Sequence, residues 1–509
     1  MNTMPFIYHI KHLFGIWLLA MFTNGSFMFR IALGAEAPTT PTLLSLHTSP
    51  LVLRHKNDER AILVATIKSG HLSNLVLRLT SEGSTQSIQT KVDRLTPGTN
   101  KVLIDVPVFP RPVRFSASLE SPAGTNVSPP LQVDPPKRWT VYLTQHTHTD
   151  IGYTRPQSEI LPEHLRYIDY ALDYCDLTDG YPDDAKFRWT CETGWAVREY
   201  LERRPAAQIQ RLKQRYHEGR IELTAMLLNM SEIASESALA ASLDYIATLK
   251  RLFGPIRTAM QNDVNGAAWC LVDYLSGIGV EFFSIGINQT RSILPFDRPT
   301  PFWWESPSGR RLLAYRSDHY MTANFWHIEQ GSLEKFVPRV EEYLPSLDAR
   351  RYPFDRVGVQ FSGYLTDNAP PSTVVCDLVK KWNEIYCSPR LRLSTAAEFL
   401  AWVKETHSHE LPVYRVAWPD WWTDGFGSAA RETAAARETD MSIQTSQALL
   451  AEASMLGQQI KNHTLARIAD IQDNLIFYAE HTYGAAESVD VPLAANSQVQ
   501  WAEKAAYLW

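Results

Sequence analysis

The sequence predicts an α/β protein, with a β-sandwich before the α/β layer or barrel and a helical bundle after it. Residues 40–135 alternate apolar and polar side chains in runs separated by turn residues, which is typical of short antiparallel strands. From residue 138 to 410, strand patterns alternate with amphipathic helix patterns, as they do in parallel sheets. Beyond residue 410 only long helical patterns remain.

The N-terminus has the layout of a secretory signal peptide. Lys11 precedes the apolar run "LFGIWLLAMF", and a second apolar stretch and small residues follow. Because Pro38 directly follows Ala37, Ala35 is the better cleavage site, and we expect residues 1–35 to be removed. The protein is then exported, to a periplasm or the extracellular space; an uncleaved N-terminal anchor is the alternative. No later segment has the roughly 18 apolar residues that span a bilayer, so no stable membrane insertion is expected after cleavage.

Domain boundaries are expected where the pattern changes. A β-sandwich-like domain occupies residues 36–135 and contains no polar constellation, so we expect a packing role. The linker "VDPPKR" holds two prolines, which stop both helix and strand. The α/β domain covers residues 138–410 and the helical bundle residues 411–509. The final pattern "VQWAEKAAYLW" has no helix-stop signal, which indicates a piece of a longer protein.

Charge and cysteine usage exclude some classes of protein. The net charge of −6 argues against a nucleic-acid-binding surface, which is normally basic. The five cysteines form no CxxC pair, so neither a zinc knuckle nor a disulfide framework is expected. A Cys376–Cys387 bridge is compatible with an oxidising compartment, and buried free thiols are the alternative.

Polar residues collect where the strands of the α/β domain are expected to end, and in such folds these ends carry the chemistry. The first strand, "WTVYLTQ", gives way to the extended segment "HTHTDIGYT", which places His146, His148 and Asp150 at every second position, on one face and roughly 7 Å apart. Later strand ends contribute further polar or aromatic groups: Glu192, Trp195, Asn229, Ser231, Glu232, Asn262, Asp263, Asp367, Asn368, Asp420 and Asp424.

Each of these residues alone has an ordinary structural explanation. Asp263 suits a helix N-cap, "TDNAPPS" suits an Asx turn, and a lone histidine is usually a core residue. Capping does not easily explain so many groups at one end of a sheet. A His-x-Asp pair joined by a distant Asp can hold Zn²⁺ with nitrogen and oxygen ligands. The sequence therefore predicts one divalent metal ion, expected to be Zn²⁺.

The motif "HTHTDIGYT" resembles the His-Ser-His-Asn-Asp-Pro-Gly-Trp signature of glycoside hydrolase family 38, the α-mannosidases. The stretch "GPIRTAMQNDVNGAAWCLVDYLSGIGVEFFSIGIN" is similar to the family's strand with the catalytic Asp and the next helix and strand. The similarity covers residues 138 to 485. It implies a seven-stranded (β/α) barrel followed by a helical bundle.

The resemblance also implies roles for single residues. His148 and Asp150 correspond to zinc ligands, and His146 lies alongside without binding. Asp263 corresponds to both a zinc ligand and the nucleophile. Asp367, in "SGYLTDN", falls near the family's general acid/base.

Departures from the family pattern affect the fourth ligand and the substrate contacts. The family usually completes its zinc site with a histidine after the barrel, but "DWWTDGFGSAA" has none. We expect Asp424 in that place, because carboxylates bind zinc, with His481 as a second candidate or a bundle histidine. Tyr153 replaces the family's tryptophan platform, and Trp422 and His481 are the other expected substrate contacts. Ile151 replaces the signature proline.

The expected function is a metal-dependent retaining glycoside hydrolase, an α-mannosidase acting on a glycan or a small α-glycoside. Retention requires two carboxylates about 5–5.5 Å apart, and the cis 2,3-diol of a mannoside suits chelation by a metal ion. One alternative is a metal-dependent polysaccharide deacetylase or an amidohydrolase-type hydrolase, which would activate a metal-bound water. Amidohydrolase sites need further histidines or a lysine on later strands, where this chain offers Asp and Glu. A catalytically inactive carbohydrate-binding protein is the last alternative.

Overall fold

The computed structural model describes residues 40–509 apart from 56–57, 84, 123, 291–293, 364–366, 420–421, 484 and 487–489. The expected signal peptide, residues 1–35, and Asp420 lie outside the described residues. Within the described part of the chain, no helix combines the length and the apolar character that crossing a membrane requires.

The N-terminal strands form two antiparallel sheets that enclose an apolar core. The strands are β1 (Thr42–Arg54), β2 (Glu59–Ser69), β3 (Leu72–Ser81), β4 (Ser87–Leu95), β5 (Gly98–Pro107), β6 (Val113–Ser121), β7 (Gly124–Val127) and β8 (Leu131–Val133). One sheet has the order β4-β3-β6-β7, with β8 paired to β6; in the other, β1, β2 and β5 are joined by β17 (Tyr386–Ser388). Leu63, Leu77 and Phe115, from β2, β3 and β6, are buried in the core between the sheets.

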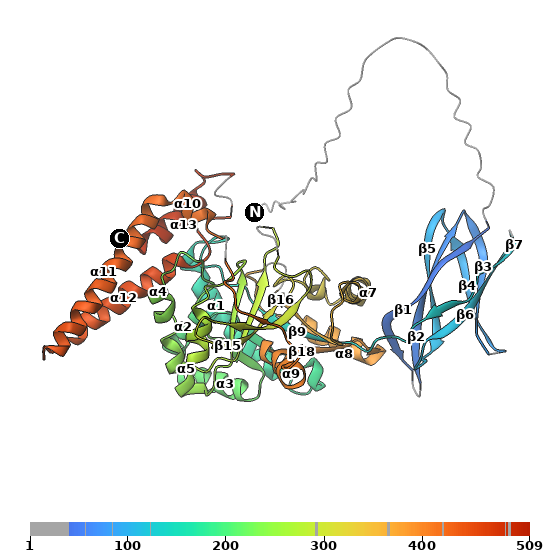
Figure 1. Cartoon of the computed structure of the whole chain (residues 1–509), viewed down its shortest axis with the longest axis horizontal. Coiled ribbons are helices and arrows are strands. Elements are labelled where there is room, and N and C mark those ends of the chain that lie inside the picture. The colour runs from blue at the N-terminus through green and yellow to red at the C-terminus, as the bar shows by residue number, and fades with distance from the viewer. Residues whose placement is uncertain are drawn as a thin grey trace, which may run out of the picture.

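The α/β region lies between these sheets and the C-terminal helices in Figure 1. Its strands are β9 (Thr140–His146), β10 (Trp189–Cys191), β11 (Ile221–Leu223), β12 (Thr258–Asp263), β13 (Phe282–Ile287), β14 (Thr300–Glu305), β15 (Arg311–Arg316), β16 (Arg356–Ser362), β18 (Arg390–Ser394) and β19 (Val413–Tyr414). The pairs β16–β9, β9–β18, β10–β11, β12–β13 and β13–β15 are parallel, as the alternation of strands and helices predicts.

Hydrogen bonding among the described strands does not close them into one seven-stranded barrel. They form the sheets β16-β9-β18, β10-β11 and β12-β13-β15-β14-β19. β10 and β11 are three residues long each, too short to carry a continuous ladder to both neighbours, and a single bridge links Thr224 to Thr258 at the start of β12. β14 runs antiparallel to β15, a hairpin that the sequence analysis did not anticipate.

Helices cover the outer faces of these sheets. They are α1 (Gln157–Leu177), α2 (Gly194–Arg203), α3 (Ala206–His217), α4 (Glu236–Ala241), α5 (Tyr245–Phe253), α6 (Leu271–Gly277), α7 (Leu333–Ala349), α8 (Val374–Ile385) and α9 (Ala396–His407), with 3₁₀ turns at Asp183–Ala185 and Ile328–Gln330. The pattern from residue 196 to 219 reads as one helix, but Pro205 separates α2 from α3, because proline disfavours a helical residue before it and lacks the N–H that a continuous helix would need.

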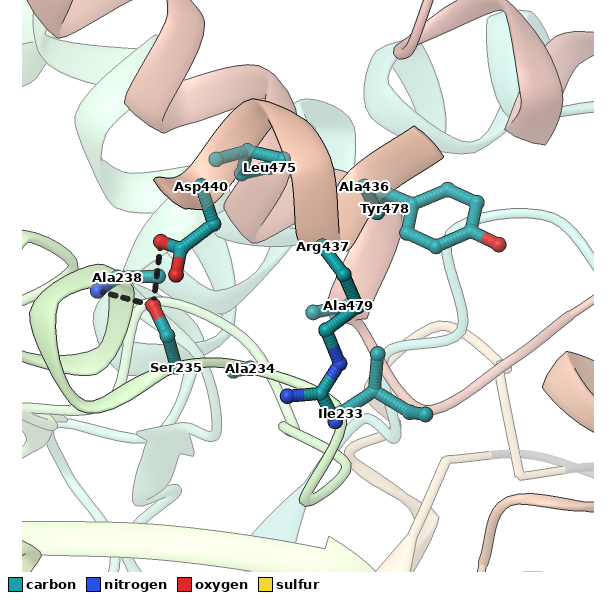
Figure 2. Close-up of a pocket in the computed structure, with 10 residues that line it drawn as sticks. All are labelled: Ile233, Ala234, Ser235, Ala238, Ala436, Arg437, Asp440, Leu475, Tyr478 and Ala479. Carbon is teal, nitrogen blue, oxygen red and sulfur yellow. Dashed lines mark hydrogen bonds between the residues drawn. The ribbon is translucent and has the colours of Figure 1, made fainter. Parts of the chain in front are cut away.

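The C-terminal part is helical, with α10 (Asp424–Ser428), α11 (Ala430–Met455), α12 (Asn462–Ala479) and α13 (Ala495–Ala506). Figure 1 shows α11 and α12 as a hairpin that extends away from the α/β region. Only Ala436 and Ile443 are buried along α11. At the base of the hairpin, Figure 2 shows Asp440 of α11 accepting a hydrogen bond from Ser235, which also caps α4 (Oγ to Oδ1, 2.6 Å).

Candidate metal centre

Four ionisable side chains face one point at the C-terminal ends of the strands: His148, Asp150, Asp263 and His481. One ligand atom from each lies within 4.8 Å of those of the other three. All are buried, and the exposed fractions are 0, 3, 6 and 1% in that order. Charged side chains are rarely buried to this extent unless they pair with one another or bind a metal.

β9 brings His148 and Asp150 to this point. The strand pairs with β16 on one side and with β18 on the other, which fixes the direction in which it ends. The chain leaves the strand after His146, and the backbone N–H of His148 then donates to the carbonyl oxygen of Asp367 (3.0 Å). The loop after β9 is therefore tied to the loop after β16.

Asp263 and His481 come from segments far away in the sequence. Asp263 is the last residue of β12 and has a positive φ of 74°, which turns the chain sharply at the strand end. The backbone N–H of Asn288 donates to its carbonyl oxygen (3.0 Å). His481 follows α12, and its N–H donates to the carbonyl oxygen of Asn229 (2.9 Å). Backbone contacts thus position both residues.

Glu192, directly after β10, supports both histidines of the first motif. Its Oε1 lies 2.8 Å from Nδ1 of His148, and its Oε2 lies 2.7 Å from Nδ1 of His146. Asn229 and Asn262 donate to the same carboxylate, at 2.7 and 2.8 Å. The other nitrogen of His146 lies 3.0 Å from a backbone carbonyl oxygen, so this residue stays beside the cluster. Nε2 of His148 is left facing the cluster, an arrangement common for metal-binding histidines.

Amide side chains hold the two carboxylates of the cluster. Asn368 donates to Oδ2 of Asp150 (2.7 Å), and Asn288 donates to Oδ1 of Asp263 (2.8 Å). The remaining oxygens, Oδ1 of Asp150 and Oδ2 of Asp263, lie 3.1 and 3.2 Å from Nε2 of His481. Each carboxylate therefore has one oxygen fixed by an amide and one turned to the centre.

This donor set fits a divalent metal ion. Nε2 of His148 and Nε2 of His481 are buried, and neither atom makes a hydrogen bond with correct geometry within the described part of the chain. Nε2 of His148 lies 3.2 Å from Oδ1 of Asp150. Ligand atoms about 2.0–2.2 Å from one ion lie about 3.0–3.6 Å from each other. The contacts of 3.1–3.2 Å between the two histidines and the two carboxylates lie in this range. Two imidazoles and two carboxylates are also the ligand types that zinc prefers.

The charges of the cluster depend on one another. Burial opposes every charge here, yet Glu192 and Asp150 raise the pKa of His148 well above its ordinary value. The two histidines in turn lower the pKa of Asp150, despite its burial. A metal ion needs the free nitrogen of each imidazole, so metal binding would displace protons from these rings.

Asp367, predicted to be the acid/base, lies near this cluster but is not part of it. Its Oδ2 accepts a hydrogen bond from the Tyr320 hydroxyl (3.3 Å), and its Oδ1 accepts one from the backbone of Asn368 (3.0 Å). Burial raises the pKa of Asp367, and the charge of nearby Asp150 raises it further. The Asp263 carboxylate differs: burial opposes its charge, but the close contact with His481 and the charge of His148 lower its pKa.

The aromatic residues expected to contact substrate also lie at this end. Tyr153 is in the loop after β9, and its carbonyl oxygen accepts a hydrogen bond from the backbone of Ala486, close to His481 in sequence (2.9 Å). The indole of Trp422 is buried, with its ring centroid 6.1 Å from that of His481. Both residues therefore lie beside the segment that carries His481.

The fourth position of the cluster is occupied by His481, which the sequence analysis placed mainly among the substrate contacts and ranked second as a ligand. Asp424, the preferred fourth ligand, begins α10, and its side chain lies outside what the structure describes. His481 stands at the end of a long helical pattern, where a histidine is usually solvent-exposed. Nothing in its local sequence distinguishes it from such a residue.

Three further supporting residues carried no sequence signal: Asn288, Tyr320 and Glu480. Oε1 of Glu480 lies 2.7 Å from Nδ1 of His481, and the carboxylate is fully buried. A carboxylate next to a histidine in sequence is ordinary, so only the fold reveals this contact.

Comparison with known proteins agrees with the sequence resemblance. Residues 138–417 match the family model described as the glycosyl hydrolases family 38 N-terminal domain. No curated protein matched the chain.

Similar solved structures come from several glycosidase-related proteins. An alpha-mannosidase from Enterococcus faecalis is 15% identical with a TM-score of 0.43, over 55% of this chain and 30% of that one. A family 38 glycosyl hydrolase from the same organism is 14% identical with a TM-score of 0.47, over 73% and 39% of the two chains. A 4-alpha-glucanotransferase from Thermococcus litoralis is 11% identical with a TM-score of 0.38, over 73% and 54%. The chain thus spans well under half the length of the first two structures.

Proposed function

The chain belongs to glycoside hydrolase family 38, and on that premise we propose that it is a metal-dependent retaining α-mannosidase. The observation that carries the proposal is the buried cluster of His148, Asp150, Asp263 and His481. The family match favours glycoside hydrolysis over the deacetylase and amidohydrolase alternatives. We also propose three domains: a β-sandwich-like domain at residues 36–135, the α/β region at 138–410 and a helical bundle at 411–509, of which the last two follow the family's order.

The four residues of the cluster would hold one divalent ion, which we propose to be Zn²⁺. When bound, such an ion supplies a site for two adjacent sugar hydroxyls and a positive charge beside the reacting carbon. Glu192 and Asn368 keep His148 and Asp150 oriented.

In this proposal Asp263 is the nucleophile of the double displacement and Asp367 is its general acid/base. Asp263 has a lowered pKa and is ionised at neutral pH, as a nucleophile for the anomeric carbon must be. Asp367 has a raised pKa and keeps its proton longer, as the acid that protonates the leaving oxygen must. After the first step Asp367 would take a proton from water, and the water would attack the glycosyl–Asp263 ester.

The sugar would bind beside Tyr153 and Trp422. Aromatic side chains offer flat apolar surfaces to sugar rings, and the loop that carries Tyr153 continues directly from Asp150. The carbonyl oxygen of Tyr153 is hydrogen-bonded to Ala486, which keeps that loop close to His481. The natural substrate class is a terminal α-mannoside, and carbohydrate is the expected binding partner.

Metal analysis combined with product stereochemistry tests the proposal. The purified protein should contain about one Zn²⁺ per chain and should hydrolyse an activated aryl α-mannoside. NMR of the initial product should show the α-anomer, as retention requires. Initial release of the β-anomer would exclude the double displacement. Tight sugar binding without turnover, unaffected by Asp263→Asn, would instead support the non-catalytic carbohydrate-binding alternative.

We further propose that the protein is exported after removal of residues 1–35. The support is the order of charged, apolar and small residues in this segment. Mass spectrometry of the N-terminus of the mature protein tests this, and an intact Met1 in the cytoplasm would contradict it.

A further inference from the structure

The helix α13 presents an unusual buried face. Ser497, Gln500 and Lys504 lie on one side of the helix, and their exposed fractions are 3, 1 and 1%. The face that a helix buries is ordinarily apolar. A buried lysine in particular is rare unless it pairs with an acidic group.

This face meets two of the three segments that build the metal centre. Lys504 donates from Nζ to Oε2 of Glu480 (2.9 Å) and to the carbonyl oxygen of the same residue (3.1 Å). Gln500 donates to the carbonyl oxygen of Tyr153, in the loop that follows Asp150 (3.2 Å). The helix therefore joins the segment with His481 to the loop after β9.

The two carboxylate oxygens of Glu480 have different partners. Its Oε2 accepts hydrogen bonds from Lys504 (2.9 Å) and from the hydroxyl and backbone N–H of Thr482 (2.7 and 3.2 Å). Its Oε1 remains for Nδ1 of His481, 2.7 Å away. With Nδ1 beside this oxygen, Nε2 of the ring faces Asp150 and Asp263.

We infer that Lys504 is a positioning residue of the metal centre, acting through Glu480 to fix the ring orientation of His481. By occupying Oε2, Lys504 fixes the rotation of the carboxylate so that Oε1 points to the ring. Without Lys504, only the two hydrogen bonds from Thr482 would hold Oε2, and the carboxylate would turn more readily toward other donors. The inference rests on the proposed metal site and adds that a helix outside the family-matched residues 138–417 contributes to it.

The test measures metal affinity and geometry in the full chain. The apoprotein is titrated with Zn²⁺ against a chromophoric chelator, and with Co²⁺, whose visible absorption reports the coordination geometry. Lys504→Met, which keeps the length of the side chain and removes its charge, should weaken Zn²⁺ binding about 10–100-fold and alter the Co²⁺ spectrum. Unchanged affinity and spectrum would overturn the inference.

Glu503→Gln is the matched control on the same helix. Glu503 accepts hydrogen bonds from the backbone N–H of Gln157 (2.7 Å) and from the hydroxyl of Ser158 (3.2 Å), both at the start of α1. Among the described residues, none of its hydrogen bonds is with Glu480 or His481. The variant weakens the docking of α13 without touching the proposed relay, so its Zn²⁺ affinity should stay near that of the wild type. An equal loss in Glu503→Gln and Lys504→Met would show that only helix docking matters, and would overturn the specific role of Lys504.

A double-mutant cycle with Glu480→Gln separates positioning from general stability. If Lys504 acts through Glu480, Lys504→Met should cost little further affinity once Glu480 is Gln. Additive losses would overturn the inference. Should Lys504→Met not fold, Glu480→Gln decides alone, and an unchanged affinity and Co²⁺ spectrum would count against the inference. A wild-type chain that binds no metal would refute the metal centre itself, which is a different failure.

Discussion

Asp263 combines a carboxylate of the metal centre with a backbone conformation that few side chains adopt. Its φ of 74° lies in the left-handed region, where Asp and Asn are the most readily accepted residues after Gly. Replacement by Asn therefore keeps the shape and the backbone and removes only the charge.

We expect Asp263→Asn to lower kcat by on the order of a thousand-fold or more and to weaken metal binding at the same time, because the proposed nucleophile is also a ligand. Steady-state kinetics and metal analysis check both effects. Asp263→Ala serves as the comparison, and its melting temperature should be the lower of the two because Ala adopts a positive φ less readily. Full activity in Asp263→Asn would contradict the proposed role.

The loss of activity on replacing Asp367 should depend on the leaving group of the substrate. We expect Asp367→Asn to lower kcat/KM by about 10²–10⁴-fold on an unactivated mannoside and far less on an aryl glycoside, because only poor leaving groups need a proton. Metal content should stay unchanged, since Asp367 is not in the cluster. A uniform loss across both substrates would argue against an acid/base role.

The same residue sets the expected pH dependence. Burial, and then the charge of Asp150, raise the pKa of Asp367, so its acid form persists above the ordinary carboxyl range and is lost as pH rises through the raised pKa. The rate on an unactivated mannoside should therefore fall along this alkaline limb. In Asp367→Asn that limb should disappear from the pH–rate profile.

Among the elements, β11 and α9 meet at a buried carboxylate. Oε2 of Glu222 accepts hydrogen bonds from the Thr190 hydroxyl and from the backbone N–H of Ala397, at the start of α9 (3.2 Å each). Burial nevertheless raises the pKa of Glu222 above its ordinary value. The folded chain then holds this proton more tightly than the unfolded chain, so the associated stability is present at low pH and is lost as pH rises through the raised pKa.

We expect Glu222→Gln to remove this dependence and to raise the melting temperature at neutral pH, because no buried charge remains. Thermal unfolding at several pH values between 4 and 8 measures it, with the wild type as reference. Equal melting temperatures at acidic pH and a gain at neutral pH are the expected result; a variant that is less stable at neutral pH would contradict the argument.

Elements with a strong local pattern could be predicted from sequence, and those that depend on partners could not. The strand before His146 and the helix over α1 follow from periodicity in their own residues. Pro205 is a local break signal, but the helical periodicity on both sides of it predicts one continuous helix. The hairpin β14–β15 was not predicted, although the turn pattern "SPSG" lies between Trp304 and Leu312.

Some residues of the metal centre could likewise be predicted from sequence, and others could not. His148, Asp150 and Asp263 lie at strand ends, so the alternation of strands and helices is enough to place them together. His481 and Lys504 reach the same place only through tertiary packing of α12 and α13, and neither helix carries a motif.

At the scale of the whole molecule, the N-terminal sheets and the α/β region share structure. β1 pairs with β17 of the α/β region, and Leu51 and Ile62 are buried in its main core. Ser49 donates to Glu341 of α7 (2.8 Å). The two parts are therefore expected to stabilise each other.

We predict one cooperative unfolding transition for these two parts, because strand pairing and core packing continue across their boundary. Differential scanning calorimetry checks it by comparing the calorimetric with the van't Hoff enthalpy. Two separated transitions, with the lower one abolished by deletion of residues 40–135, would contradict the prediction.

The wide spacing of the metal-binding residues along the chain has a consequence for the lifetime of the protein. Residues 148 and 481 enclose nearly all of the α/β region, so a partly folded chain cannot offer the complete set of ligands. Ion binding then favours the native chain by mass action, by about 2.7 kcal/mol when the free ion is at 100 times its dissociation constant. The concentration of free metal around the protein would thus determine how often the chain opens to a protease, quite apart from any effect on turnover.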